Sequence, residues 1–186
     1  MLSIKTTSDV RSATKQFEAL GSDQRGLAAI EFAFFASILS FALLNVTDIS
    51  IYIYQRMEVE YAAEVGAQAA WKTCDLKQLP ATKNCSGLST AVTNAVQSTS
   101  LGTRVTLQSG YPSEGYYCVN SSNALQYMSD VSSRPSDCSN AGMSNLQPGD
   151  YIKGQTTFSY APLFPGITVA SAFSTPITKT TMMRLG

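Results

Sequence analysis

One carboxylate lies where an ionisable group is costly. Glu31 immediately precedes an uncharged, apolar run that extends from residue 32 to residue 47. A charged side chain at the middle of a membrane span costs about 2.5–3.5 kcal/mol on insertion scales, and less toward the end of the span. Such a glutamate can reach the headgroups or complement the positive end of the helix dipole.

The remaining sequence offers little catalytic chemistry, because it contains no histidine. Ser-His-Asp and Cys-His catalysis, histidine-ligated metals and histidine pH switches are therefore excluded. Glu58, Glu60 and Glu64 could form a carboxylate site, but their pattern is more typical of a solvated helix face. We expect no enzyme activity, catalytic residue, metal or cofactor. The formal net charge of zero provides no basic face, so we also expect no nucleic-acid partner.

Four cysteines follow the apolar run: Cys74, Cys85, Cys118 and Cys138. None belongs to a C-x-x-C pair, which makes a zinc site a weak interpretation. An even number of cysteines on one side of a membrane segment indicates disulfides in an oxidising compartment. Among three possible pairings we favour Cys74–Cys85 with Cys118–Cys138, because each closes a short loop and could contribute roughly 3 kcal/mol. Free buried thiols are the alternative.

Residues 27–54 are predicted to form a membrane-spanning helix. These 28 residues would extend about 42 Å, whereas about 20 residues suffice to cross the hydrocarbon core. A cleavable signal peptide is the alternative, but the apolar character continues to Ile53 and no small-residue cleavage site follows. Lysines and arginines near the two ends slightly favour a cytoplasmic N-terminus. Residues 1–26 would then be a cytoplasmic leader, and the cysteines would lie outside the cytoplasm.

The helix is expected to continue beyond the membrane to about residue 72. Residues 55–71 are rich in alanine, glutamate and glutamine and contain no proline. A mixed stripe recurs there at helical spacing: Tyr54, Glu58, Tyr61, Val65 and Ala69. Near the outer end of the span, Asp48 is interpreted as an interfacial residue, and Tyr52 and Tyr54 as part of an interfacial aromatic belt.

Residues 73–186 predict a small α+β head. A short amphipathic helix is expected around residues 88–96. Strands are expected at Thr103–Leu107, Tyr116–Val119, Tyr151–Tyr160 and Ile177–Arg184. Residues 120–149 predict a surface excursion held by Cys138, and the proline-punctuated residues 161–166 exclude a central strand. Several tyrosines are interpreted as packing residues rather than an adhesive patch: Tyr111, Tyr116, Tyr117 and Tyr127.

The segment Arg25-Gly26-Leu27-Ala28-Ala29-Ile30-Glu31-Phe32 resembles the processing region of type IV prepilins. In that family, cleavage follows a glycine, and glutamate is the fifth residue of the mature chain. The resemblance implies a cut between Gly26 and Leu27 by a membrane prepilin peptidase. It also implies that Glu31, followed by Phe32, neutralises the new terminal ammonium of a neighbouring subunit during assembly.

The resemblance extends to TadE-like proteins, the minor pseudopilins of tight-adherence (Tad/Flp) pilus systems. It rests on the start GLAAIEFAFF, the Ala-rich continuation at residues 62–67, and the C-terminal TTFSYAPLFPG with its Met182-Met183-Arg184 ending. It is strong over residues 26–70 and weak over residues 71–150. Major Flp-type pilins are much shorter and usually have Glu-Tyr in place of Glu31-Phe32, which favours a minor role.

Together these features predict a pilin-like α+β protein: a long N-terminal transmembrane and amphipathic helix followed by a small antiparallel-sheet head. The resemblance implies a bacterial inner-membrane protein with a periplasmic head, able to join a surface pilus. Its expected partners are membrane lipid, the prepilin peptidase, other pilin-like subunits and the Tad secretion platform. The alternative is an unprocessed single-pass membrane protein whose head is a binding or adhesion module.

Overall fold

The computed structural model describes residues 24–186, which fall into two units. The first unit ends at Val46, and the second extends from Thr47 to Gly186. One helix of 50 residues, α2 (Gln24–Thr73), makes up the described part of the first unit and continues into the second. Residues 1–23, which hold most of the predicted leader, lie outside the described residues.

In the first unit, α2 presents apolar side chains to the surroundings on every side. Phe32, Phe34, Phe35 and Phe41 are all more than half exposed. Among the described residues, α2 is the one helix long and apolar enough to cross a membrane, and the most apolar part of it is not buried. A helix that is apolar all round requires lipid or other apolar surfaces for its burial.

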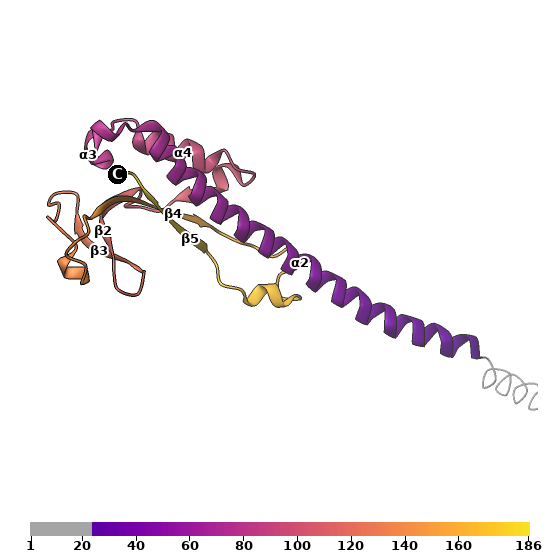
Figure 1. The fold of residues 1–186 in the computed structure, drawn as a ribbon. Coiled ribbons are helices and arrows are strands. Elements are labelled where there is room, and N and C mark those ends of the chain that lie inside the picture. The colour runs from indigo at the N-terminus through magenta and orange to yellow at the C-terminus, as the bar shows by residue number, and fades with distance from the viewer. Residues whose placement is uncertain (1–23) are drawn as a thin grey trace, which may run out of the picture. The chain divides into compact units, whose positions relative to one another are not determined.

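The second unit contains one antiparallel sheet of five strands, shown with the helices in Figure 1. They are β1 (Val105–Leu107), β2 (Ser113–Val119), β3 (Leu125–Asp130), β4 (Gly149–Phe158) and β5 (Ile177–Arg184). β4 is central: β5 pairs with it along one edge, from Tyr151↔Arg184 to Phe158↔Ile177. Along the other edge, β2 pairs with its first half and β1 with its second half, and β3 pairs with β2.

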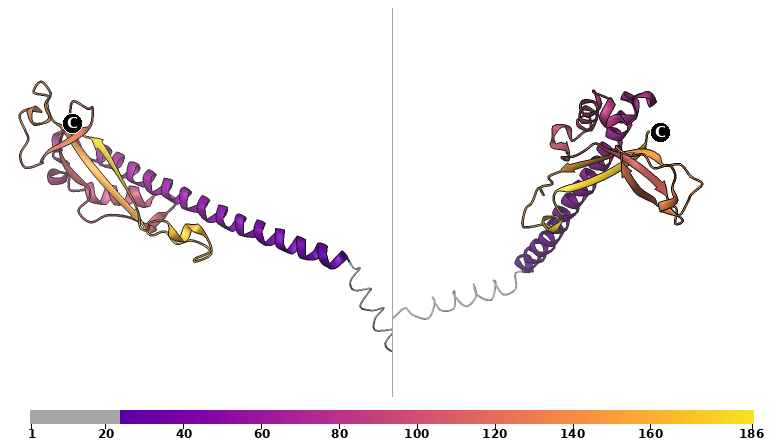
Figure 2. Two further views of the ribbon diagram at one scale, coloured as in Figure 1. Left: turned by 90° about the horizontal axis from the view of Figure 1, so that it is seen from below. Right: turned by 90° about the vertical axis from the view of Figure 1, so that its left-hand side faces the viewer.

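The head-packed part of α2 lies with α3 (Ala81–Asn84) and α4 (Leu88–Gln97) over one face of this sheet (Figures 1 and 2). Alternate β4 residues are buried on that face, among them Ile152, Thr156 and Phe158. The period of two along β4 therefore sets which side chains meet the helices. The architecture is the pilin-like α+β arrangement that the sequence predicts.

The face of α2 that packs in the head is built from small residues. The fully or nearly buried positions are Val59, Ala62, Ala63, Gly66, Ala67 and Ala70. This face differs from the mixed stripe read from the sequence, in which Tyr54 and Tyr61 are both 55% exposed. Small side chains let the helix backbone approach its neighbours closely: a Cβ added to Gly66 would lie 2.8 Å from Cγ2 of Val96 on α4.

The predicted strands and the helix around residues 88–96 correspond to β1, β2, β4, β5 and α4. Residues 120–149, predicted as a surface excursion, also contain a strand that was not predicted, because β3 forms within them and pairs with β2. The expectation for residues 161–166 is confirmed, since they form a loop between β4 and β5.

Candidate membrane-anchoring and assembly site

The predicted processing and assembly residues all lie on the first turns of α2. Gly26, Leu27, Glu31 and Phe32 are exposed, and no atom lies within 4 Å of a Cβ added to Gly26. Leu27 and Glu31 are four residues apart, so they share one face of the helix about 6 Å apart along its axis. Among the described residues, Glu31 makes no ion pair; the one ion pair there joins Lys179 to Glu60.

Asp48 is buried in the head, so its carboxylate is not exposed to the membrane surface as the interfacial interpretation implies. Its side chain is fully buried, and three groups donate hydrogen bonds to its carboxylate. The backbone N–H of Leu163 donates to Oδ1 at 2.9 Å, and that of Phe164 to Oδ2 at 3.2 Å. The Thr168 hydroxyl also donates to Oδ2, at 2.6 Å. Asp48 therefore fixes the backbone of a distant loop to α2.

Tyr52 continues this attachment one turn further along α2. Its ring packs edge-on against Tyr160, with centroids 5.0 Å apart, and against Phe173 at 4.6 Å. The aromatic-belt interpretation of Tyr52 is therefore wrong, because its ring faces the head. Tyr54 is the exposed member of the pair, and its hydroxyl donates to Ser100 Oγ at 3.4 Å.

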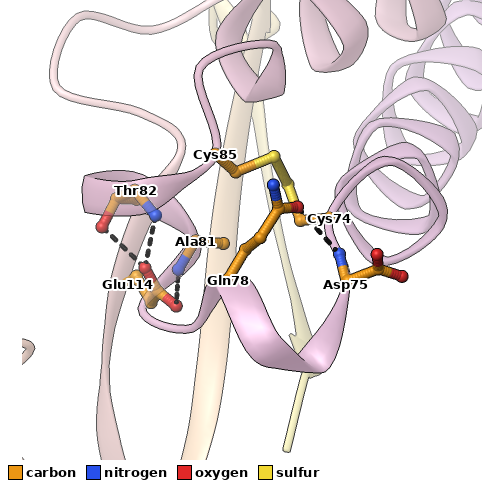
Figure 3. The surroundings of a disulfide bond; sticks show 7 residues. All are labelled: Cys74, Asp75, Gln78, Ala81, Thr82, Cys85 and Glu114. Carbon is orange, nitrogen blue, oxygen red and sulfur yellow. Dashed lines mark hydrogen bonds between the residues drawn. A yellow bond between two sulfur atoms is a disulfide. The ribbon is translucent and has the colours of Figure 1, made fainter.

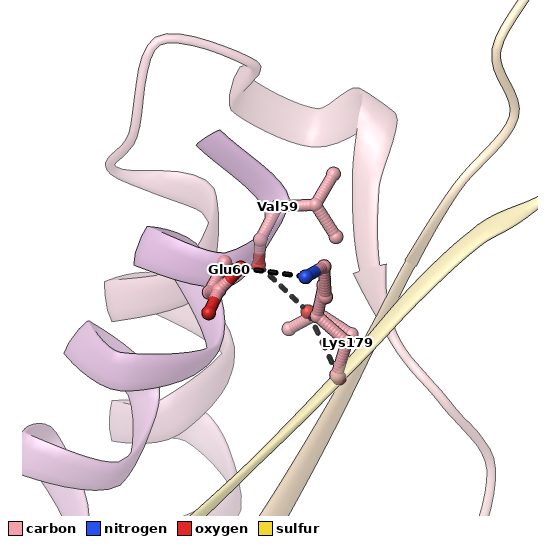
Figure 4. A network of polar contacts seen from close by, with 4 residues as sticks. Val59, Glu60 and Lys179 are labelled. Atoms are coloured by element: carbon pink, nitrogen blue, oxygen red, sulfur yellow. Dashed lines mark hydrogen bonds and ion pairs between the residues drawn. The ribbon is translucent and has the colours of Figure 1, made fainter. Parts of the chain in front are cut away.

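Further along, α2 is tied to the sheet by the polar contacts in Figure 4. The buried Thr156 hydroxyl on β4 donates to the backbone oxygen of Val59 at 3.0 Å. The Lys179 ammonium on β5 donates to Glu60 Oε2 at 2.6 Å. This contact holds the pKa of Glu60 below its usual value. Glu58, in turn, accepts a hydrogen bond from Ser100. Two of the three predicted surface glutamates thus contact the head, and Glu64 is exposed.

Both disulfides have the pairing that the short loops favour. Cys74–Cys85 joins the end of α2 to the end of α3, with a Cα–Cα distance of 5.8 Å (Figure 3). Beside it, the Glu114 carboxylate on β2 accepts hydrogen bonds from the backbone N–H groups of Ala81 and Thr82, both at 2.7 Å, and from the Thr82 hydroxyl. The disulfide and the carboxylate together hold α3 against the sheet.

The second disulfide, Cys118–Cys138, anchors the region after β3 to β2. Its two cysteines and Ala141 form a small cluster of their own, against which Met128 and Met143 pack. The prediction that Cys138 holds this region to the head is therefore confirmed.

Asp150, at the start of β4, is the least satisfied carboxylate of the head. It is 5% exposed, and its Oδ1 has no hydrogen-bond partner among the described residues. Burial, reinforced by the negative charge of Glu114, raises its pKa to about 7. An uncharged Asp150 therefore suits this position better than an ionised one.

Tyr117 is at the centre of a group of packed tyrosine rings, in agreement with the packing role that the sequence predicts. The Tyr117 ring lies edge-on to both Tyr127, at 5.4 Å, and Tyr151, at 5.6 Å. Tyr116 is buried, and Lys153 lies over the Tyr111 ring at 5.9 Å. Within residues 24–186, no group of three or more cysteine, aspartate or glutamate side chains is placed to hold a metal ion.

Comparison of the chain with protein-family models, curated proteins and solved structures finds no match. What the structure establishes is the pilin-like arrangement of a long, apolar N-terminal helix and an antiparallel-sheet head with two disulfides. The apolar helix and the disulfides together favour a membrane anchor with an extracytoplasmic head.

Sequence reasoning missed the contribution of Asp48 because its partners are more than 110 residues away. Its hydrogen bonds to Leu163, Phe164 and Thr168 span 115, 116 and 120 positions of sequence. A signal did exist: a carboxylate beside an apolar run must find donors, and residues 154–178 carry no charge but contain many threonines and serines.

Proposed function

We propose that this chain is a minor pseudopilin of a tight-adherence type pilus or secretion apparatus. It is inserted with its leader in the cytoplasm, cut after Gly26 by a membrane prepilin peptidase, and assembled through α2 with other pilin-like subunits. The head remains on the extracytoplasmic side and the protein catalyses no reaction. Its partners are membrane lipid, the peptidase, neighbouring pilin-like helices and the secretion platform.

The observation that carries this proposal is the position of Glu31 on an otherwise uncharged helix surface. It stands four residues beyond Leu27 and directly before the run of residues 32–47, which contains no charge. Its neighbours Ile30, Phe34 and Phe35 are between 64% and 69% exposed. A charged residue in an apolar membrane segment is costly, so it is expected to have a specific partner in the assembled protein.

Processing would create that partner. Hydrolysis of the Gly26–Leu27 peptide bond leaves a free ammonium on Leu27, close to lipid. In a bundle of parallel helices, Glu31 of one subunit can accept hydrogen bonds from the Leu27 ammonium of the next. The two charges then neutralise each other, whereas each alone would be costly in an apolar environment. Subunits offset along the axis by about one turn would satisfy this contact.

The apolar surface of α2 supplies the attraction, and the charge pair supplies the register. Side chains such as Phe32, Phe34 and Ile38 are more than half exposed and would pack on neighbouring helices. Apolar packing alone would let neighbouring helices slide along one another, because lipid and helix surfaces are similarly apolar. An ion pair within the apolar helix contact makes any other axial position of the two helices unfavourable, because it would leave both charges unpaired.

The assembly claim is tested by comparing Glu31→Gln with wild type for pilus formation in cells that carry the complete apparatus. We expect a loss of at least about tenfold with intact membrane insertion, because the ammonium is left without its carboxylate. Glu64→Gln is the matched control, since it makes the same chemical change at an exposed position of the same helix. Normal piliation with Glu31→Gln would contradict the proposal and favour a single-pass binding or adhesion protein.

A further inference from the structure

The connection between β4 and β5, residues 159–176, is an uncharged and partly apolar loop. It lies within residues 154–178, the longest stretch of the sequence without a charged side chain. Leu163, Ile167 and Val169 are 60%, 56% and 55% exposed. Large apolar side chains gathered on one exposed loop are unusual for a surface that faces only water.

This β4–β5 loop is held in a fixed position beside α2. The carboxylate of Asp48 binds the backbone N–H groups of Leu163 and Phe164 and the hydroxyl of Thr168. The loop then returns through a short 3-10 turn at Val169–Ala172 and through Phe173, which packs on Tyr52. In Figures 1 and 2 the loop lies next to the helix, at the end of the head away from β2 and β3.

The position of Asp48 in the sequence indicates where this end of the head lies along α2. Asp48 is the first charged residue after the uncharged run of residues 32–47. A helix that crosses a bilayer with this run leaves the hydrocarbon at about Asp48. Because the loop is hydrogen-bonded to Asp48 itself, it would lie near the bilayer surface if α2 crosses the membrane with this run.

We propose that the β4–β5 loop is a second membrane contact: Leu163 and Ile167 enter the headgroup and acyl boundary of the outer leaflet crossed by α2. The occupant is lipid, because the loop is bonded to the residue that ends the uncharged run and has no charged side chain to recognise a polar partner. Apolar side chains of peripheral segments typically penetrate about 5–10 Å into this boundary. The proposal rests on α2 spanning the membrane, but not on cleavage or pilus assembly.

The loop contact would orient the head. A head anchored through one membrane helix can rotate together with that helix about its axis and can tilt against the membrane. A second contact on one side of α2 restricts both motions and fixes which face of the sheet is turned away from the membrane. Asp48 serves as the positioning residue, since it fixes the loop without touching lipid.

The test uses the full-length chain in phosphatidylcholine bilayers, with bromine-labelled acyl chains as the quencher. The sequence has a single tryptophan, Trp71, about 35 Å beyond Asp48 along α2. In a Trp71→Phe background, Ile167→Trp and Leu163→Trp each place one indole on the loop. We expect strong quenching and a blue-shifted emission for both variants, because indole rings favour the interface.

Two controls separate the possible failures. Wild-type Trp71 should be unquenched, because the head carries it away from the bilayer. Phe41→Trp in the same background reports on the span and should be quenched most strongly. Quenched Phe41→Trp with unquenched loop variants would overturn the loop proposal and leave the anchor and the proposed function intact. Unquenched Phe41→Trp would overturn both the loop contact and the membrane anchor.

Discussion

At the scale of single residues, two buried carboxylates of the head behave in opposite ways. Asp48 receives three hydrogen bonds and is satisfied as an anion. Asp150 has an oxygen without a described partner and a neighbouring carboxylate, so burial acts against its charge. Ionised groups stay buried only where donors replace the lost water. The first residue therefore organises a loop, and the second makes the head sensitive to pH.

Replacing Asp48 by asparagine should loosen the β4–β5 loop. Both oxygens of the Asp48 carboxylate accept hydrogen bonds from the loop. In asparagine one of them is replaced by an NH₂ group, which cannot accept, so at least one hydrogen bond is lost. We expect amide hydrogen exchange in residues 161–173 to accelerate about tenfold or more, with β4 unaffected. Mass spectrometry of exchanged peptides measures this, with Glu64→Gln as the control. Unchanged exchange in the loop would show that Asp48 does not hold it.

The raised pKa of Asp150 predicts a head that loses stability as pH rises. The folded state holds the proton up to about pH 7, whereas the unfolded chain releases it near the ordinary value of 3.8. Between pH 3.8 and about pH 7 the folded state therefore binds more protons than the unfolded chain. The protonated Asp150 stabilises the fold at low pH, and this stabilisation is lost as the pH rises to about 7. Denaturant unfolding near pH 5 and pH 8 should differ by on the order of 1–2 kcal/mol.

Asp150→Asn should remove most of this dependence, because the amide does not titrate. The variant is expected to equal the wild type at the lower pH and to exceed it at the higher pH. An equal fall in stability for wild type and Asp150→Asn would assign the effect to another group.

At the scale of elements, the two parts of α2 differ in composition and in what they contact. Residues 32–47 are apolar on all sides, whereas the part from Val59 to Ala70 buries only a face of small residues. Small residues suit this position, because they let α4 and the sheet approach the helix backbone. The hydroxyl of Thr156 reaches the Val59 oxygen for this reason.

Gly66→Leu should therefore destabilise the head. A Cβ at this position already lies 2.8 Å from Val96 and 3.4 Å from Val92, so a larger side chain must displace α4. Overpacking of this kind costs about 1–3 kcal/mol. Thermal unfolding of the detergent-solubilised chain measures the change, and Gln68→Leu, on the exposed face of α2, should have little effect. Equal stability of the two variants would contradict the close α2–α4 packing.

The sequence predicted those elements whose side chains alternate or recur regularly. β5 was located to the residue, and β4 within two residues, because both alternate along a half-buried sheet. β3 was missed because four of its six residues are exposed and because serine and asparagine residues flank it in the sequence. The buried face of α2 was misjudged because alanine and glycine carry little hydrophobic signal. Asp48 and Tyr52 could not be placed, since their partners lie across the whole head.

At the scale of the whole molecule, the described chain combines an apolar helix that needs lipid or other helices with a cross-linked head. Two carboxylates of the described residues need an explanation in terms of their positions. Glu31 makes no ion pair among the described residues, and Asp48 binds the β4–β5 loop. An assembly subunit accounts for both. The account depends most on the leader being removed, because only then does Leu27 supply the ammonium that Glu31 would neutralise.

The most direct measurement is the N-terminal sequence and intact mass of the protein isolated from membranes in which the prepilin peptidase is present. A parallel sample from cells without the peptidase provides the uncut reference. The account predicts a mature chain that begins at Leu27 only when the peptidase is present. A chain that retains residues 1–26, or begins at any other residue, would contradict it.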